Sequence, residues 1–165
     1  MATRVQFRRG TTSEHSSFTG AVGEVTVDTD KDVVVVHDGS TAGGKPSPSL
    51  STAQTFTKAQ RGGVTTLTSS SNATAIDLSL NNFFTITLSE NTTFGAPTNA
   101  VAGQAGSIFI VQDGSGNRTG SFHSNFKFTG GADPTLTTTA NAVDRIDYVV
   151  KSSTEIHAVA TLALA

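Results

Sequence analysis

A run of four valines, Val33, Val34, Val35 and Val36, constrains the fold of this 165-residue chain more than any other stretch. β-Branched residues favour extended backbone, so the run predicts a strand. Continuous apolar character, as opposed to alternation, is typical of a strand that is buried on both faces. The fold must therefore supply an apolar environment on two sides of this strand.

Short elements surround the valine run within residues 7–44. The expected elements are a strand at residues 3–8, a helical turn before Phe18 with capping-box spacing at Thr11 and Glu14, a strand at residues 24–28 with Val25 and Val27 on one face, and a hairpin turn at residues 29–32. Together they predict a small β module.

About forty residues are too few to enclose a doubly buried strand, because so short a chain covers little apolar surface. We therefore expect the module, residues 1–46, to complete its core with other copies of itself, and a homotrimer is the simplest closed solution. The candidate assembly residues are Phe7, Arg8, Arg9, Val33, Val34, Val35 and Val36. The Arg8–Arg9 pair is either a solvated strand end or an ion pair with Asp30 or Asp32 at an interface.

Prolines and serines in residues 45–52 predict an extended connector. The predicted linker covers residues 47–62 and includes a short helix at residues 55–60. A second domain then occupies residues 63–165.

The second domain reads as six to eight short strands separated by turns. Apolar residues alternate with polar ones in two sets, and three phenylalanines are expected on one face of another strand: Ile76, Leu78 and Leu80; Phe84, Ile86 and Leu88; and Phe122, Phe126 and Phe128. Further strands are expected at residues 107–112, 145–150 and 155–162. The turn at Asn81 and Asn82 predicts a hairpin between the first two sets. The fold class is therefore all-β, a small module followed by a β-sandwich or jelly-roll-like domain, without a repeat period that favours a solenoid.

Composition excludes several classes of function. The net charge of −2 gives no electrostatic footprint for nucleic acid, and no apolar run is long enough for membrane insertion. The chain has no Cys, which excludes disulfides and thiolate metal sites. The first residues lack the apolar stretch of a secretory signal, so we expect synthesis in a cytoplasm.

No motif predicts a catalytic, cofactor or metal site. Asp28, Asp30 and Asp32 have the first spacings of a calcium loop, but Val33 and Gly39 stand where glycine and glutamate are needed. The four histidines, His15, His37, His123 and His157, are scattered along the sequence. We expect the acidic cluster to form a turn and the chain to bind no cofactor.

The N-terminal stretch resembles a known module, on the motifs at residues 7–12, 18–20, 23–31, 34–39 and 43–44 together with His15. It is similar to the N-terminal domain of the major tropism determinant family, found on phage fibre and virion proteins. This resemblance implies a β-prism formed by three chains, which anchors a receptor-binding portion to the particle. Residues 55–60, 103–104, 128–131 and 147–149 resemble a C-terminal domain of other phage structural proteins.

The resemblance implies a non-enzymatic phage protein on the virion surface, made in the host cytoplasm. The expected function is that of a homotrimeric tail-fibre or adhesin subunit that contributes to host attachment, with itself, other virion proteins and host-surface glycan as partners. The alternative is a capsid decoration (cement) or head-fibre protein. A depolymerase is the third class, and a domain of this size leaves little room for its β-helix or carboxylate cleft.

Overall fold

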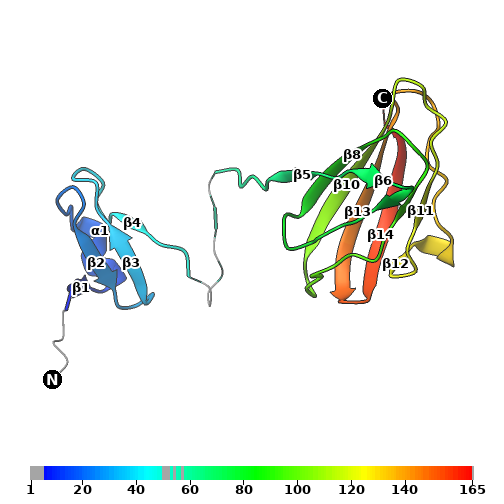
Figure 1. Cartoon of the computed structure of the whole chain (residues 1–165). Coiled ribbons are helices and arrows are strands. Elements are labelled where there is room, and N and C mark those ends of the chain that lie inside the picture. The colour runs from blue at the N-terminus through cyan, green and yellow to red at the C-terminus, as the bar shows by residue number, and fades with distance from the viewer. Residues whose placement is uncertain (1–5, 50–52, 54, 57, 165) are drawn as a thin grey trace. The chain divides into compact units, whose positions relative to one another are not determined.

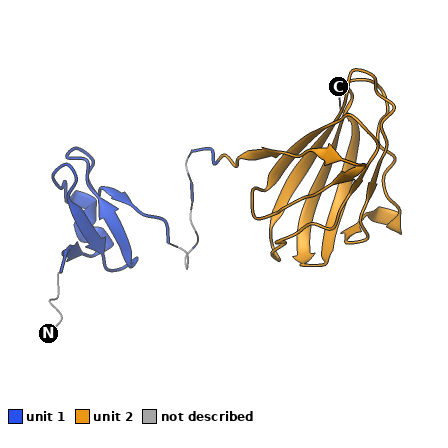
Figure 2. Cartoon of the chain, viewed as in Figure 1, with its two compact units in different colours: residues 1–60 blue, residues 61–165 orange. Residues whose placement is uncertain are grey.

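The computed structural model describes residues 6–49, 53, 55–56 and 58–164. The chain divides into two compact units, residues 1–60 and residues 61–165 (Figures 1 and 2). Each unit has its own sheet structure, so each is described by itself. The finer division into a 1–46 module, a 47–62 linker and a 63–165 domain stays a prediction.

The N-terminal unit is a small four-stranded sheet covered by one short helix (Figure 1). Its elements are β1 (Arg8–Gly10), α1 (Thr12–Ser17), β2 (Val25–Asp28), β3 (Val33–Val36) and β4 (Lys45–Pro46). β1 pairs with β2 in parallel, and β2, β3 and β4 pair antiparallel in that order. The capping box at Thr11 and Glu14 is confirmed, and so is the turn between β2 and β3.

Three local predictions for this part of the chain differ from the structure. The first strand begins at Arg8 and continues to Gly10, whereas residues 3–5 lie outside the described residues. Lys45 and Pro46 form β4, and Pro46 is tolerated there because β4 is the edge of the sheet. The helix expected at residues 55–60 is wrong for the described residues 55–56 and 58–60, because six residues with no apolar face to bury make a marginal helix.

The C-terminal unit consists of two sheets that face each other across one core (Figure 1). Its elements are β5 (Val64–Thr66), β6 (Ser69–Ser70), β7 (Ala73–Thr74), β8 (Phe83–Leu88), β9 (Thr92–Phe94), β10 (Ala105–Gln112), β11 (Gly120–Phe122), β12 (Phe126–Lys127), the 3-10 turn η1 (Thr129–Gly131), β13 (Val143–Ser152) and β14 (Glu155–Leu164). The six-stranded sheet has the order β12-β14-β13-β10-β8-β5, and the four-stranded sheet has the order β11-β9-β7-β6. The expected all-β sandwich is confirmed.

The chain winds between the two sheets instead of folding into successive hairpins. β5, β8 and β10 are parallel neighbours in the larger sheet, and β7, β9 and β11 are parallel neighbours in the smaller one. Successive strands are thus added in parallel to each sheet in turn, as in a solenoid. The sequence has no repeat, so it did not predict this arrangement. β13 and β14 form an antiparallel pair, as expected, and β12 pairs in parallel with β14 at the edge of the larger sheet.

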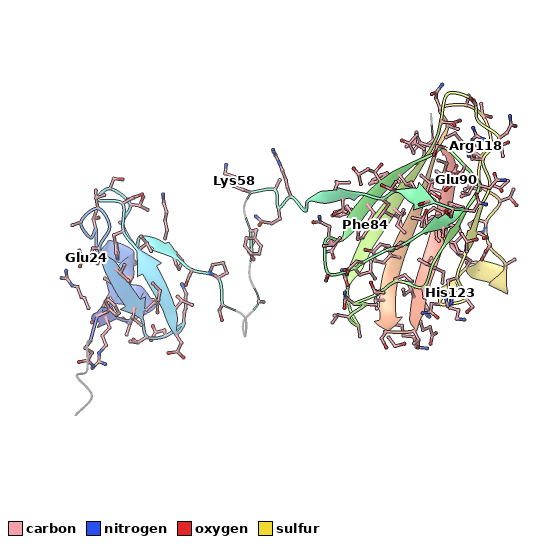
Figure 3. All side chains as sticks on the ribbon, viewed as in Figure 1. Glu24, Lys58, Phe84, Glu90, Arg118 and His123 are labelled. Atoms are coloured by element: carbon pink, nitrogen blue, oxygen red, sulfur yellow. The ribbon has the colours of Figure 1, made fainter. Side chains whose placement is uncertain are left out.

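The core of the C-terminal unit lies between the sheets. Phe84, Ile86 and Leu88 point inward from β8, and Ile108 and Ile110 do so from β10. Figure 3 labels Phe84, which is fully buried. Alternation along each strand places every second residue in this core, so the intervening residues form the outer face of the sheet.

The predicted hairpin at residues 76–88 is wrong. Ile76 and Leu78 are buried, but they lie in an irregular segment with one isolated bridge, and Leu80 is exposed. β8 pairs with β10 and β5, both in parallel. Three alternating apolar residues can bury their side chains without joining a strand ladder, so the pattern predicted burial correctly and pairing incorrectly.

The predicted phenylalanine strand is also wrong, although its residues do meet. Phe122 belongs to β11 and Phe126 to β12, and these strands lie in different sheets. The ring of Phe122 packs edge-on against Phe126 and Phe128, with centroids 5.4 and 5.0 Å away, and stacks on Phe94 at 4.8 Å. The aromatic cluster therefore joins the two sheets at one end of the core.

Gly106 permits a close approach that a larger residue would block. A side chain at this position would overlap the carbonyl of Asn82, to which the Tyr148 hydroxyl donates a hydrogen bond of 2.9 Å. We expect Gly106→Ala to lower the free energy of unfolding of this unit by about 1–3 kcal/mol, as overpacking does. Gly114→Ala is the matched control, since nothing lies within 4 Å of its added carbon. Equal denaturant midpoints for the two variants would contradict this prediction.

Candidate functional site

Two histidine rings meet over one threonine beneath the sheet of the N-terminal unit. His15 on α1 and His37 after β3 stack with ring centroids 6.2 Å apart. The Nε2 atom of each ring lies 2.9 Å from the Thr26 hydroxyl. All three side chains are buried. The small core of this unit is thus largely polar.

The outer nitrogens of the two rings determine how this cluster is hydrogen-bonded. His15 Nδ1 lies 3.0 Å from the Thr11 carbonyl and donates to it, and the Gly20 amide donates to His37 Nδ1 at 3.3 Å. His37 Nε2 therefore donates to the Thr26 hydroxyl, which donates in turn to His15 Nε2. The resulting chain of hydrogen bonds fixes β2 against α1 with Thr26 pointing inward.

Because Thr26 points inward, its neighbours on β2 point outward. The register places Val25 opposite Val36 and Val27 opposite Val34. We call these four side chains the valine face. Val34 is 45% and Val36 is 48% exposed, and the other two are half-buried. The N-terminal unit thus presents a contiguous apolar surface on the side of the sheet away from its helix.

The valine run of β3 alternates within one chain. Val33 and Val35 are buried beneath the sheet, whereas Val34 and Val36 belong to the valine face. Burial on both faces, which the run predicts, would therefore require a second layer over the valine face. The N-terminal unit itself supplies a layer on one side of the sheet only.

Cationic residues flank the valine face. Arg9 on β1 is in register with Val27, and Lys45 on β4 is opposite Val36. Phe7 is exposed immediately before β1. Of the candidate assembly residues, the structure thus brings Arg9, Val34 and Val36 to one side of the sheet.

Arg8 has partners within its own chain, and the interface ion pair with Asp30 or Asp32 stays a prediction. Its Nη1 atom lies 3.2 Å from Glu24 Oε1, and its guanidinium carbon lies 4.1 Å from the centroid of the Phe18 ring. The Ala21 amide, followed by the Arg8 guanidinium, lowers the pKa of Glu24. Asp30 instead accepts a hydrogen bond from the Thr12 amide. Within one chain, Arg8 thus stabilises the edge of the N-terminal unit.

Asp28 is a buried carboxylate that organises the turn after β2. It accepts hydrogen bonds from the Thr12 hydroxyl, at 2.7 and 3.0 Å, and from the amides of Asp30 and Lys31. Burial raises the pKa of Asp28, but these hydrogen bonds outweigh burial and leave the pKa below its ordinary value of 3.8. The carboxylate thus connects α1 to the β2–β3 turn.

This arrangement predicts that acid weakens the N-terminal unit. Because the folded pKa of Asp28 is lowered, its charge stabilises the fold above about pH 4 and this stabilisation is lost as the pH falls through the folded pKa. The unfolding temperature of the unit should therefore fall as the pH is lowered from about 5 to about 2, with a shallower slope in Asp28→Asn. An unchanged slope in that variant would contradict the assignment.

The remaining histidines do not join the cluster. His123 Nδ1 accepts the Asn125 amide, and His157 pairs with Glu155 at 3.0 Å. In the part of the chain that the structure describes, no three His, Cys, Asp or Glu side chains gather as a metal site would require. None of its described helices is long and apolar enough to cross a membrane.

The His15–Thr26–His37 cluster was missed from the sequence. Its members lie on three elements, and each histidine taken alone has no motif around it. One signal was available: Val25 and Val27 share a face, so Thr26 and Asp28 had to share the other. What the sequence did not show is which of the two faces α1 covers.

The fold and these surfaces define an all-β chain of two units, whose most distinctive surface is an apolar sheet face beside a polar core. Residues 63–157 match the family described as "Putative phage tail fibre C-terminal domain", and the chain belongs to this family. Residues 5–41 match the major tropism determinant N-terminal domain. Both resemblances noted in the sequence are thereby confirmed, and as a tail-fibre protein the chain is a virion component.

One curated protein and two solved structures are also similar to this chain. The chain is 55% identical over 76 residues to the tail fiber receptor-binding protein of Bordetella phage BPP-1. This match covers 46% of this chain and 20% of the relative. It is 67% identical to the major tropism determinant I1 variant over 27% of this chain and 12% of that one, with a TM-score of 0.27. The M1 variant is 27% identical over 94% of this chain and 31% of that one, with a TM-score of 0.30. The chain thus spans about a fifth of the length of the curated relative.

Proposed function

We propose that the chain is a homotrimeric, non-enzymatic tail-fibre subunit. Its N-terminal unit joins the copies and anchors them to the phage particle, and its C-terminal unit contributes to host attachment. The observation that carries the proposal is the valine face, an exposed apolar layer on a unit whose own core is small and polar. A relative that is 55% identical to this chain over 76 residues is described as a tail fiber receptor-binding protein.

The energetics support self-association through the valine face. Covering a half-exposed valine contributes about 1 kcal/mol, so four per copy favour a trimer by several kcal/mol on each subunit. A unit of this size has little other apolar surface to bury. Three copies related by a closed rotation would place equivalent valine faces around one axis.

Two measurements test the proposal. Light scattering at micromolar concentration should give the mass of three copies of the 17.0 kDa chain. Purified protein added to host cells should compete with the phage that encodes it and reduce its adsorption. A monomeric mass would overturn the assembly role, and adsorption that is unaffected by excess trimer would overturn the attachment role.

A further inference from the structure

The outer face of the six-stranded sheet carries exposed apolar side chains in register. One row across the sheet consists of Val64, Phe83, Ser107, Asp147 and Val159. Val64 is 56% and Val159 is 61% exposed. The four residues other than Val64 alternate with core residues of their own strands, and Val64 is in register with Phe83, so all five face away from the sandwich.

The two ends of this row differ in shape. Val64 lies on β5, the strand at one edge of the sheet. Near the opposite edge, a groove of about 520 Å³ is lined by Phe128, Val149 and Val159 together with polar residues that include Lys127 and His157. Val149 is 53% exposed. One side of the face thus offers an apolar edge and the other an apolar groove.

The polar groups in the middle of the face already have partners. Asp147 accepts the Ser107 hydroxyl at 2.6 Å, and the Arg145 Nε and Nη2 atoms at 3.0 and 2.9 Å. The charge of this network is balanced, so covering it leaves no single ion unpaired.

The charged groups beside the groove are paired in the same way. Glu155 accepts Lys151 Nζ at 2.8 Å and His157 Nε2 at 3.0 Å, and these two partners lower the pKa of Glu155 to about 2. Lys127 Nζ donates to the Ser124 carbonyl at 2.6 Å. A polyhydroxylated ligand is recognised by convergent polar groups that the ligand itself satisfies, whereas these are satisfied within the chain. A face of this composition suits the apolar surface of another protein.

We propose that this face is the contact between C-terminal units of neighbouring copies: the β5 edge around Val64 of one copy packs into the groove at Val149 and Val159 of the next. The inference rests on the proposed trimer. An edge-to-groove contact joins different patches, and three such contacts close a ring.

In the proposed trimer the N-terminal units tether the copies, so a contact of modest area is sufficient for the C-terminal units to associate. The predicted extended connector at residues 47–62 reaches at most about 50 Å, at about 3.1 Å per residue. Once the N-terminal units hold three copies together, the C-terminal units meet at an effective concentration on the order of millimolar. Each unit therefore needs only a small apolar contact to associate.

Paired cysteines in the full chain test the contact, since the natural chain has no Cys. Within one copy, positions 64 and 159 are four strand spacings apart, about 19 Å, too far for a disulfide. Mild oxidation of Val64→Cys/Val159→Cys should therefore yield covalent trimers on a non-reducing gel, at least tenfold more than in either single variant. The matched control is Ser70→Cys/Ser121→Cys on the exposed face of the four-stranded sheet, for which we expect no covalent trimer.

Light scattering of the same samples separates the two proposals. A trimeric mass without a link between positions 64 and 159 would overturn this contact and leave the proposed function standing. Equal cross-linking of the test and control pairs would also overturn it, because the link would then report tethering alone. A monomeric mass would overturn the trimer and this contact together.

Discussion

Replacing Val34 and Val36 together by aspartate is expected to convert the protein from a trimer to a monomer. Both side chains belong to the valine face, and neither contributes to the core beneath the sheet. In the proposed trimer each copy would bury two carboxylates, and Lys45, opposite position 36, already pairs with Asp38 at 3.2 Å, so the burial of each carboxylate costs several kcal/mol. Every 1.4 kcal/mol corresponds to a tenfold change in affinity, so the trimer should weaken by more than a thousandfold.

Light scattering over a range of concentrations measures this effect directly. Val22→Asp is the matched control: Val22 lies in a turn of the same unit, is 83% exposed and is not part of the valine face. This variant should keep the trimeric mass. Hydrogen exchange should show that the double variant keeps its protected amides on β2 and β3, so that loss of assembly is distinguished from unfolding. A trimeric mass in a folded double variant would contradict the role of the valine face.

Elements that depend on neighbouring residues were predictable from the sequence. The capping box at Thr11 and Glu14 forms because the two residues bond each other within one helical turn. Strand β8 forms where Phe84, Ile86 and Leu88 alternate, because alternation alone places all three in the core. Local spacing is sufficient for such elements.

Strand pairing was not predictable in the same way. Alternation at Ile76 and Leu78 indicated burial correctly, but burial does not determine which strand lies alongside. The Asn81–Asn82 turn suggested a hairpin, yet the partners of β8 are β5 and β10, each about twenty residues away along the chain. Parallel neighbouring strands are not joined by a short turn, so no local sequence motif indicates that the chain alternates between the two sheets.

The sequence indicated which residues are candidates for assembly, but not which of them lie together on one exposed surface. The valine run indicated that the strand needs cover on two sides, and the structure shows which side the chain itself covers. That choice depends on how α1 docks, and α1 docks through His15, which bonds Thr26. A polar contact between distant residues thus decides which valines face outward.

Thr26→Val should therefore have the second large effect, unfolding of the N-terminal unit. Valine keeps the shape of threonine and removes the hydroxyl, which leaves the Nε2 atoms of His15 and His37 without their partner. A buried polar atom without a hydrogen bond costs about 1–3 kcal/mol, so the two together cost roughly 2–6 kcal/mol. A unit whose helix and strands all lie between residues 8 and 46 has little stability beyond this amount.

Hydrogen exchange resolved by residue measures the outcome unit by unit. In Thr26→Val, amides of β2 and β3 should lose protection while those of β10 and β13 keep it, because the C-terminal unit has its own core. Thr29→Val is the matched control, since its hydroxyl makes one exposed hydrogen bond to the Gly10 carbonyl and its loss should cost less than about 1 kcal/mol. Equal protection of β2 in the two variants would mean that the histidine pair does not hold the sheet. Loss of β2 protection together with loss of the trimer would connect the polar core to assembly, because the valine face exists only while Thr26 points inward.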